Sequence, residues 1–277
     1  MTTLITGATG FVGAAVARRV LAEGRPVRAL VRHDSDRSNI EGLDVAVVEG
    51  DLTDAASLAE AVRGCKSVFH VAADYRIWCP DPAAMMATNV EGSRALMRAA
   101  AEAGVQRAVY TSSVATIMPH ADGTPADENT PSSVDNMIGS YKRSKYLAEQ
   151  VVLAVAEETG LEVVVVNPST PVGPRDIRPT PTGRLIRDAA AGRVPAYVET
   201  GLNIVHVDDV ADGHWLAHKR GNVGRRYILG GENMSLRKIL STVTRLAGRR
   251  PPTLQLPNPL AMGIAHMSEA VARLTGR

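Results

Sequence analysis

The chain has 277 residues, of which 45% are hydrophobic and 22% charged, values typical of a globular protein rather than a disordered or fibrous one. A net charge of +2 and an aromatic content of 4% argue against a nucleic-acid partner, which would need a basic field or a base-stacking surface. Two cysteines, Cys65 and Cys79, without a CxxC spacing are too few for a zinc cluster or a disulfide scaffold, so we expect free thiols and no metal site.

The hydropathy pattern bears on location. No run approaches the roughly 18 apolar residues of a membrane span. A strand that begins by residue 3 leaves no place for a signal peptide. We therefore expect a cytoplasmic protein without a membrane span.

The stretch 3–13 joins an apolar run, a glycine-rich turn and a helical pattern. Leu4 and Ile5 are typical of a buried strand, glycines follow at positions 7, 10 and 13, and apolar residues recur at three- and four-residue spacing from Val12 onward. Strand, glycine turn and helix form the context of a dinucleotide site, in which the pyrophosphate binds at the helix N-terminus.

Each glycine has its own part in this prediction. Gly7 takes the backbone angles of a tight turn, Gly10 lets a pyrophosphate approach the main chain, and Gly13 lets the helix pack closely on the strand. The spacing is GxxGxxG rather than the standard GxGxxG, and a glycine motif alone is a weak signal because turns use glycine freely. Its position after a strand favours a nucleotide site.

The second predicted strand, 26–32, indicates which dinucleotide binds. In an NAD site, an acidic residue about 20 residues beyond the glycines bonds the ribose 2′-hydroxyl. This strand instead ends in Arg32, and an arginine there pairs with a 2′-phosphate, so the sequence favours NADP(H) over NAD(H). The alternatives are a merely exposed arginine and, because Asp34 and Asp36 lie close by, an NAD site.

Four further apolar segments are predicted strands, at 44–52, 67–73, 107–113 and 161–166. Helical segments lie between them, including 57–62, 83–103 and a helix entered at 140–150. Because each strand is followed by a crossover, we expect an α/β fold with a parallel, doubly wound sheet.

Several features near the ends of the predicted strands bear on the site, and some of them have two interpretations. Asp51 either bonds the adenine or is a turn residue, and the sequence favours neither. Ala72 and Ala73 are small enough for a ligand to pass close to the chain, whereas His70 is more typical of a buried strand histidine than of a catalyst. The aromatic loop 74–82 is either a substrate wall or a local packing anchor.

From residue 167 onward the chain is rich in turn formers. The stretch 203–210 is a predicted short strand that leads into a helix capped by an aspartate, and further helical stretches are predicted at 180–191, 236–247 and 259–273. We expect a dinucleotide-binding domain over 1–166, with contributions from about 203–230, and an interleaved substrate lobe over most of 167–277.

Tyr141 and Lys145 are four residues apart in a predicted helix, so their side chains face the same way. A phenol has an ordinary pKa of about 10, and a neighbouring ammonium lowers it by favouring the phenolate. The tyrosine is then able to exchange a proton with a substrate oxygen, while the ammonium holds a ribose hydroxyl. Ser113, at the end of the fifth strand, offers a hydroxyl to the same oxygen. A surface Tyr–Lys contact is the alternative.

Together these motifs resemble the extended short-chain dehydrogenases/reductases, the NAD-dependent epimerase/dehydratase group. Segment 6–13 is similar to the cofactor turn of that family, 141–145 to its YxxxK, 111–113 to its hydroxyl strand and 206–211 to its HVDDVA stretch. The resemblance implies a Rossmann-type fold and a homodimer packed through the helices that follow Ala83 and Tyr141.

The resemblance also assigns roles to residues. It aligns Ser113, Tyr141 and Lys145 as catalytic, with Ser112 as the fallback serine. With the motifs above, it implies a cofactor site formed by Gly7, Thr9, Gly10, Phe11, Val12, Gly13, Arg32, Asp51, Leu52, Ala72, Ala73, Tyr141, Lys145, Pro168 and Thr170.

Within the group, the stretches 70–78, 167–176 and 196–203 are most similar to hopanoid-associated sugar epimerases, which themselves resemble dihydroflavonol 4-reductases. Our leading hypothesis is an NADP(H)-preferring oxidoreductase that reduces a carbonyl, or oxidises a secondary alcohol, of a small molecule by hydride transfer. The alternatives are a nucleotide-sugar epimerase or dehydratase that recycles NAD(P) internally, and a non-catalytic cofactor-binding protein. Resembling proteins continue beyond residue 277, so we expect a C-terminally shortened lobe whose pocket is open, completed by a partner chain or defective.

Overall fold

The structure is a computed structural model that describes residues 1–76, 79, 81–120, 122–260 and 262–263. The chain divides into two compact units. The first comprises 1–177 and 205–230, and the second comprises 178–204 together with the chain from 231 onward. Each unit is described by itself below.

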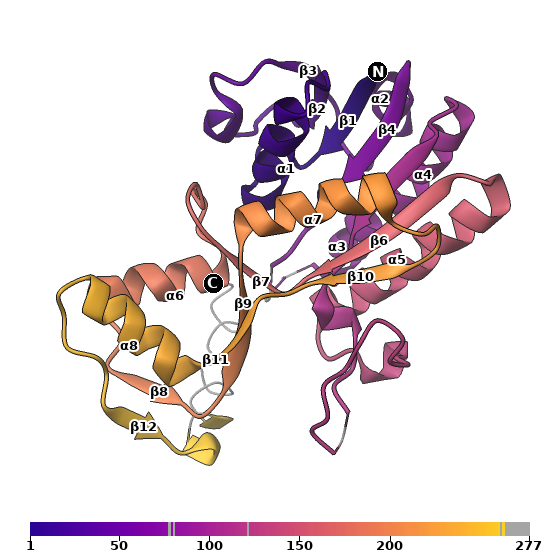
Figure 1. Cartoon of the computed structure of the whole chain (residues 1–277). Coiled ribbons are helices and arrows are strands. Elements are labelled where there is room, and N and C mark those ends of the chain that lie inside the picture. Colours follow the sequence, from indigo (N-terminus) through magenta and orange to yellow (C-terminus); the bar gives the residue numbers. More distant parts are fainter. Residues whose placement is uncertain (77–78, 80, 121, 261, 264–277) are drawn as a thin grey trace. The chain divides into compact units, whose positions relative to one another are not determined.

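The first unit is built on a seven-stranded sheet in which all the pairings are parallel (Figure 1). The order β10-β6-β5-β4-β1-β2-β3 reverses direction between β4 and β1, the arrangement that places a ligand at the carboxyl ends of a doubly wound sheet. The predicted α/β, Rossmann-type sheet is confirmed. Its strands are β1 (Thr2–Thr6), β2 (Val27–Val31), β3 (Val45–Glu49), β4 (Cys65–His70), β5 (Arg107–Thr111), β6 (Glu162–Pro168) and β10 (Arg226–Leu229).

Helices cover both faces of this sheet (Figure 1). Neighbouring strand residues therefore enter different cores: Leu4 packs with α2, α4 and α5, whereas Ile5 packs with α1 and α7. This two-sided burial explains why the strands are apolar throughout instead of alternating. The helices are α1 (Phe11–Ala22), α2 (Ala55–Val62), α4 (Gly92–Glu102), α5 (Ser140–Thr159) and α7 (Val207–Arg220).

The helix predicted over 83–103 is three segments. α3 (Pro82–Met86) is followed by a π-helical turn, η2 (Ala87–Glu91), and then by α4. Asp81 caps α3 by accepting a hydrogen bond from the Ala84 N–H at 3.1 Å. The π turn matters for the site because it holds Asn89, and such turns are frequent at functional positions.

The predicted aspartate cap of the later helix, α7, is wrong. The strand β9 (Gly201–His206) runs directly into α7, so His206 occupies the capping position and its Nδ1 accepts the Asp208 N–H at 3.2 Å. Asp208 and Asp209 lie in the first helical turn, where their charges favour the helix dipole without capping it.

The second unit has a small core of Ala189, Tyr197 and Leu240. Within it, β9 pairs antiparallel with β11, and β8 pairs parallel with β12. The helix predicted over 259–273 lies largely outside the described residues. The elements are α6 (Pro181–Ala190), β8 (Ala196–Val198), β11 (Glu232–Ser235), α8 (Leu236–Leu246) and β12 (Leu254–Leu256); the short β7 (Thr170–Val172) belongs to the first unit.

Among the described residues, no helix combines the length and apolar character needed to cross a membrane. Cys65 is buried and Cys79 half-buried, and both thiols are free, as predicted. The same part of the chain gathers no group of histidine, cysteine and carboxylate side chains that would hold a metal ion.

Candidate active site

The site begins at the carboxyl ends of β1, β4, β5 and β6. Because these strands are parallel neighbours, their ends meet at one edge of the sheet. The turn at Gly7 follows β1, Ala72 and Ala73 follow β4, Ser113 follows β5, and Pro168 ends β6 with Thr170 just beyond it. The structure thus brings these predicted residues to one edge.

The glycine turn has room for glycine alone at two positions. Gly7 has a φ of 70°, and a Cβ there would lie 2.8 Å from the Ala72 nitrogen and 2.9 Å from its Cα. A Cβ on Gly13 would overlap the Gly7 carbonyl. At either position a Cβ would lie closer to the neighbouring backbone than real Cβ atoms do, so the turn between β1 and α1 closes only with glycine at both.

The N-terminus of α1 is open to an anion. Gly10 is the capping residue, no side chain caps the helix, and the first turn contains no acidic residue. Gly10 is exposed, and Thr9, Phe11 and Val12 beside it are half-buried. Backbone N–H groups at such an end attract phosphate. An uncapped helix end beside a cradle that a Cβ would fill fits the pyrophosphate of a dinucleotide.

Asn39, which sequence reasoning missed, supports this turn from η1 (Ser38–Ile40). Its buried side chain donates to the Thr9 carbonyl at 3.2 Å, and its own carbonyl accepts from Arg18 at 2.6 Å. Asn39 therefore ties the turn to the segment that follows β2.

Arg32 lies exposed just beyond the end of β2. Asp51, at the turn beyond β3, accepts hydrogen bonds from the Thr53 N–H at 2.8 Å and the Thr53 hydroxyl at 2.6 Å. Burial acts to raise the pKa of Asp51, but the Thr53 bonds and the charge of Arg32 outweigh it, so the pKa is lowered. These bonds stabilise the turn after β3 and leave the predicted contact of Asp51 with adenine open, and the charge of Arg32 acts on Asp51. Leu52, next to it, is buried.

Lys145 is held by β5. Its side chain is 3% exposed, and the Nζ donates to the Thr111 carbonyl at 2.7 Å and to the Tyr110 hydroxyl at 3.1 Å. The ammonium also lies 4.7 Å from the centre of the Tyr110 ring. Tyr141, one turn earlier on α5, is half-buried, and it lies close enough to the Ser113 side chain for that side chain to act on its pKa.

The pKa shifts follow from this geometry. Burial raises the pKa of Tyr141, and the nearby Ser113 side chain partly opposes the rise. Burial lowers the pKa of Lys145 to about 8, against the charge of Glu149, which acts to raise it. The prediction that Lys145 lowers the pKa of Tyr141 is wrong. The Lys145 ammonium is bonded to the Tyr110 hydroxyl and to the Thr111 carbonyl instead, and the pKa of Tyr141 is raised.

The two serines after β5 differ in their surroundings. Ser112 is buried and donates its hydroxyl to the Glu149 carboxylate. Ser113 is half-buried, caps η3 (Val114–Thr116) by accepting the Ala115 N–H at 3.1 Å, and lies beside Tyr141. The hydroxyl available beside Tyr141 is therefore that of Ser113.

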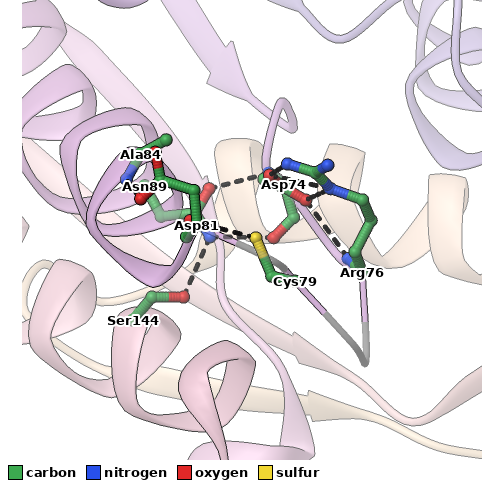
Figure 2. A network of polar contacts seen from close by, with 7 residues as sticks. All are labelled: Asp74, Arg76, Cys79, Asp81, Ala84, Asn89 and Ser144. Atoms are coloured by element: carbon green, nitrogen blue, oxygen red, sulfur yellow. Dashed lines mark hydrogen bonds and ion pairs between the residues drawn. The ribbon is translucent and has the colours of Figure 1, made fainter. Parts of the chain in front are cut away.

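A polar network connects the loop after β4 to α5 (Figure 2). Asn89, in the π turn, accepts the Asp74 N–H at 2.7 Å and donates to the Asp74 carbonyl at 2.8 Å and to the Ser144 hydroxyl at 2.9 Å. Ser144 lies between Tyr141 and Lys145 and donates to the Tyr141 carbonyl at 2.8 Å. Asn89 thus fixes the loop to the turn of α5 that carries the candidate catalytic pair.

Figure 2 also shows the beginning and end of the loop predicted as a substrate wall. Asp74 pairs with Arg76 at 2.5 Å, and the Cys79 thiol lies 3.1 Å from the Asp81 carbonyl. Residues 77, 78 and 80, which include the tryptophan of that prediction, lie outside the described residues.

His70 is a buried strand histidine, as predicted. It is 0% exposed, its Nδ1 lies 2.8 Å from the Thr6 hydroxyl, and its Nε2 lies 2.8 Å from the Ser93 hydroxyl. Burial, with a contribution from Lys145, lowers its pKa to about 3, so the ring is neutral. It is bonded on both sides and has no nitrogen left for catalysis.

Residues 3–230 match the model of the NAD dependent epimerase/dehydratase family. The chain belongs to this family. The resemblance to extended short-chain dehydrogenases/reductases is therefore confirmed, and membership implies an NAD(P) cofactor, which the cradle at Gly7 and Gly13 fits.

Several members of the family are similar over nearly the whole chain. A Synechocystis protein named "Putative dihydroflavonol 4-reductase" is 47% identical over 277 residues, covering 99% of this chain and 80% of that protein. "Sterol demethylase protein B" of Methylococcus capsulatus is 38% identical over 273 residues, with coverage of 99% and 83%. The crystal structure of gox2253 has 56% sequence identity and a TM-score of 0.91, with coverage of 99% and 83%.

Proposed function

We propose that this chain is an NADP(H)-preferring reductase of a carbonyl compound, which in reverse oxidises a secondary alcohol. The observation that carries the proposal is that the Tyr141 and Ser113 side chains lie close together at the sheet edge where the glycine turn also lies. Two hydroxyls from different elements converge there, and a buried lysine lies one helical turn away. The similarity to the Synechocystis relative supports reduction.

The chemistry divides between the cofactor and the chain. A bound nicotinamide supplies the hydride that the carbonyl carbon gains. Tyr141 gives its phenolic proton to the carbonyl oxygen, and Ser113 donates a hydrogen bond that holds that oxygen in place. Lys145, held to β5 by its bonds to the Tyr110 hydroxyl and the Thr111 carbonyl, would bind a ribose hydroxyl of the cofactor. Burial raises the pKa of free Tyr141, so the phenol is protonated and ready to act as the acid in the reducing direction.

The remaining predicted residues divide between two tasks. The glycine turn with Thr9, Phe11 and Val12 would bind the pyrophosphate, and Arg32 would bind a 2′-phosphate. Leu52, Ala72, Ala73, Pro168 and Thr170 would line the rest of the cofactor. In this proposal 1–166 with about 203–230 binds the dinucleotide, and most of 167–277 forms the substrate lobe.

A second copy of the chain is the partner that we propose, packed along α4 and α5. The family resemblance supports this homodimer. Light scattering at several concentrations tests it, and a monomer at all concentrations would remove it.

A second candidate function is a nucleotide-sugar epimerase or dehydratase. The match of residues 3–230 to the epimerase/dehydratase family favours it. The similarity to sterol demethylase protein B, for its part, supports a hopanoid- or sterol-related context. Such an enzyme would keep its cofactor bound and convert a sugar nucleotide with no net change in nicotinamide absorbance, whereas the reductase would consume NADPH with a carbonyl substrate.

The deciding experiment follows NADPH oxidation over a panel of carbonyl compounds and sugar nucleotides. For a compound that is turned over, Tyr141→Phe and Ser113→Ala should each lower kcat by roughly 100-fold or more, while the NADPH Kd stays within about threefold. Tyr146→Phe is the matched control, because Tyr146 lies on the same helix and its hydroxyl donates to the Ser132 carbonyl at 2.9 Å.

Two outcomes would reject the proposal. Full turnover by Tyr141→Phe would remove the assigned acid. Tight NADPH binding without conversion of any compound in the panel would favour the third possibility, a non-catalytic cofactor-binding protein.

A further inference from the structure

A buried carboxylate lies one turn beyond Lys145 on α5. Glu149 is 1% exposed, and its Oε1 pairs with the Arg226 Nε from β10 at 2.7 Å. Its Oε2 accepts the Ser112 hydroxyl, the Thr116 hydroxyl at 3.2 Å and the Asn167 side-chain amide at 3.3 Å. A carboxylate buried this deeply is tolerated only when it is paired and hydrogen-bonded. Glu149 meets this condition, because Arg226 pairs with one oxygen and hydrogen-bond donors contact the other.

The same donors also hold the segment of Ser113. The Thr116 hydroxyl, besides facing Glu149, lies 2.8 Å from the Ser113 carbonyl. The Asn167 amide donates to that carbonyl at 3.1 Å. Ser112, bonded to the carboxylate, is the neighbour of Ser113 in the chain. Three residues that contact Glu149 thus fix the backbone at and before Ser113, whose side chain lies beside Tyr141.

Glu149 also acts on Lys145 by its charge. The two residues are four apart on α5, so their side chains share a helix face. In a site without water, a negative charge at this spacing favours the ammonium over the neutral amine. This contribution opposes the burial that brings the Lys145 pKa down to about 8.

The other ionisable groups around Lys145 are neutral in this environment. Burial raises the pKa of Tyr110 on β5 and of Tyr141 on α5, and lowers that of His70 on β4 to about 3. The exposed pair of Arg98 on α4 and Glu158 lies 13 residues further along α5 than Lys145, roughly 20 Å away.

We propose that Glu149 is a positioning residue with two tasks: its carboxylate holds the Ser113 segment in place, and its negative charge keeps the Lys145 amine protonated. The effect on turnover rests on the function proposed above, whereas the effect on Lys145 exists in the chain without cofactor or substrate.

The test measures Lys145 directly. The chain contains five lysines, so ¹³C-labelled lysine side chains give a small set of NMR signals, and the signal lost in Lys145→Met identifies this residue. In the cofactor-free chain, Glu149→Gln keeps the side-chain shape and removes the charge, so Lys145 should titrate at a lower pH than in the wild type. Glu157→Gln, at an exposed position on the same helix, should leave that titration unchanged.

Arg226→Gln provides a second variant with the opposite sign. It removes the cation that offsets the carboxylate, so Lys145 should titrate at a higher pH. If Glu149→Gln does not fold, this variant decides alone: a rise supports the proposal, and no change or a fall overturns it. If both variants fold and neither moves the Lys145 titration, the charge role is rejected and Glu149 has a merely structural role.

Turnover gives the independent readout. With NADPH and a substrate found in the panel, the alkaline limb of the kcat/KM profile of Glu149→Gln should move to lower pH, with a loss of about tenfold at high pH for each pH unit of displacement. A uniform loss at every pH, with the alkaline limb unmoved, would reject the charge task and leave only the positioning of Ser113. A shifted Lys145 titration in a chain without reductase activity would reject the proposed function and leave this inference intact.

Discussion

The Lys145 ammonium contacts Tyr110 rather than Tyr141: its Nζ lies 3.1 Å from the Tyr110 hydroxyl and 4.7 Å from the centre of that ring. Together with the bond to the Thr111 carbonyl at 2.7 Å, this contact fixes the lysine to β5. The Tyr141 side chain lies beside Ser113 instead. The residues that the YxxxK spacing places on one helix face thus have separate partners, and the cation is anchored before any ligand binds.

Tyr110→Phe tests this anchor. The variant keeps the ring beneath the ammonium and removes the hydroxyl that accepts from it, and a hydrogen bond to a charged group contributes about 1.5–3 kcal/mol. We expect a loss of unfolding free energy of that order in denaturant titration, and an alkaline limb of turnover displaced to lower pH because the ammonium loses an acceptor.

Tyr227→Phe is the control for that variant, since the Tyr227 hydroxyl accepts the Asn222 N–H at 2.9 Å and lies on the edge strand β10. It should leave the pH profile unchanged. An unaltered profile in Tyr110→Phe as well would show that the hydroxyl does not support the lysine.

Gly7→Ala and Gly24→Ala form a matched pair that separates strain from collision. Both glycines have a φ of 70°, so each alanine costs about 1 kcal/mol through the left-handed backbone. A Cβ at position 24 meets nothing, whereas one at position 7 lies 2.8 Å from the Ala72 nitrogen. We expect Gly7→Ala, but not Gly24→Ala, to lose a further ~1–3 kcal/mol of unfolding free energy, as overpacked sites do. Gly7→Ala should also weaken NADPH binding by about tenfold or more.

Thermal unfolding and NADPH fluorescence titration measure the two effects. Equal losses of stability in both variants would show that the backbone angle matters and the approach of Ala72 does not. Unchanged NADPH affinity in a folded Gly7→Ala chain would place the dinucleotide elsewhere.

The sheet and its strand-end residues were predictable because they depend on local pattern. Buried parallel strands are apolar along their whole length, and the turn after each strand is at the sheet edge whatever the rest of the fold does. Gly7, Ala72 and Ser113 lie within two residues of the ends of their strands, so predicting the strands was enough to place these residues at one edge.

The partners of the site residues were not predictable, because they depend on how α5 lies over β5. Tyr110 reads in the sequence as an ordinary strand residue, and only the packed structure shows it beneath Lys145. Asn89 and Glu149 left a faint signal, since each is a polar residue on the buried face of a helix. The π turn around Asn89 adds one residue to a backbone ring, a change that no side-chain pattern records.

Arg32→Ala and Arg37→Ala compare two arginines that follow β2. Arg37 pairs with Glu49 at 2.5 Å, and Glu49 also faces His33 at 3.1 Å, whereas Arg32 lies beside Asp51 without such a bridge to it. We expect Arg32→Ala to weaken NADPH binding about tenfold and to leave NADH binding within about twofold, because only NADPH has a 2′-phosphate.

Arg37→Ala should change the preference less than Arg32→Ala does, because its guanidinium is already engaged by a carboxylate. Parallel titrations of each variant with NADPH and NADH give the ratio. Equal affinity of the wild type for the two cofactors, or equal loss of both in Arg32→Ala, would remove the assignment of Arg32 to the phosphate.

Buried histidines should make the fold sensitive to acid. His214 is 0% exposed, its Nδ1 lies 2.7 Å from the Val210 carbonyl, and its Nε2 lies 2.8 Å from the Thr111 hydroxyl. Because an N–H is needed to face a carbonyl, Nδ1 carries the proton and Nε2 accepts from Thr111. Burial lowers the pKa of this ring to about 4, so it stays neutral in the folded chain at pH values where an unfolded histidine is charged.

The direction of the pH effect follows from this difference. Between about pH 6.5 and about pH 4 the unfolded chain binds a proton at His214 that the folded chain does not, so the free energy of unfolding falls by about 1.4 kcal/mol for each unit of acidification. Above that range the stabilisation from the neutral ring is fully present. In His214→Gln the slope of stability against pH should decrease by this amount, even if the variant is less stable overall.

Urea titrations at several pH values measure the slope, with His120→Gln at an exposed position as the control. His70, also neutral and 0% exposed, should sustain part of the acid sensitivity in both variants, so a residual slope is expected. If wild type and His214→Gln have the same slope, His214 binds a proton as readily in the folded chain as in the unfolded chain. That result would contradict the prediction drawn from its burial and its two hydrogen bonds.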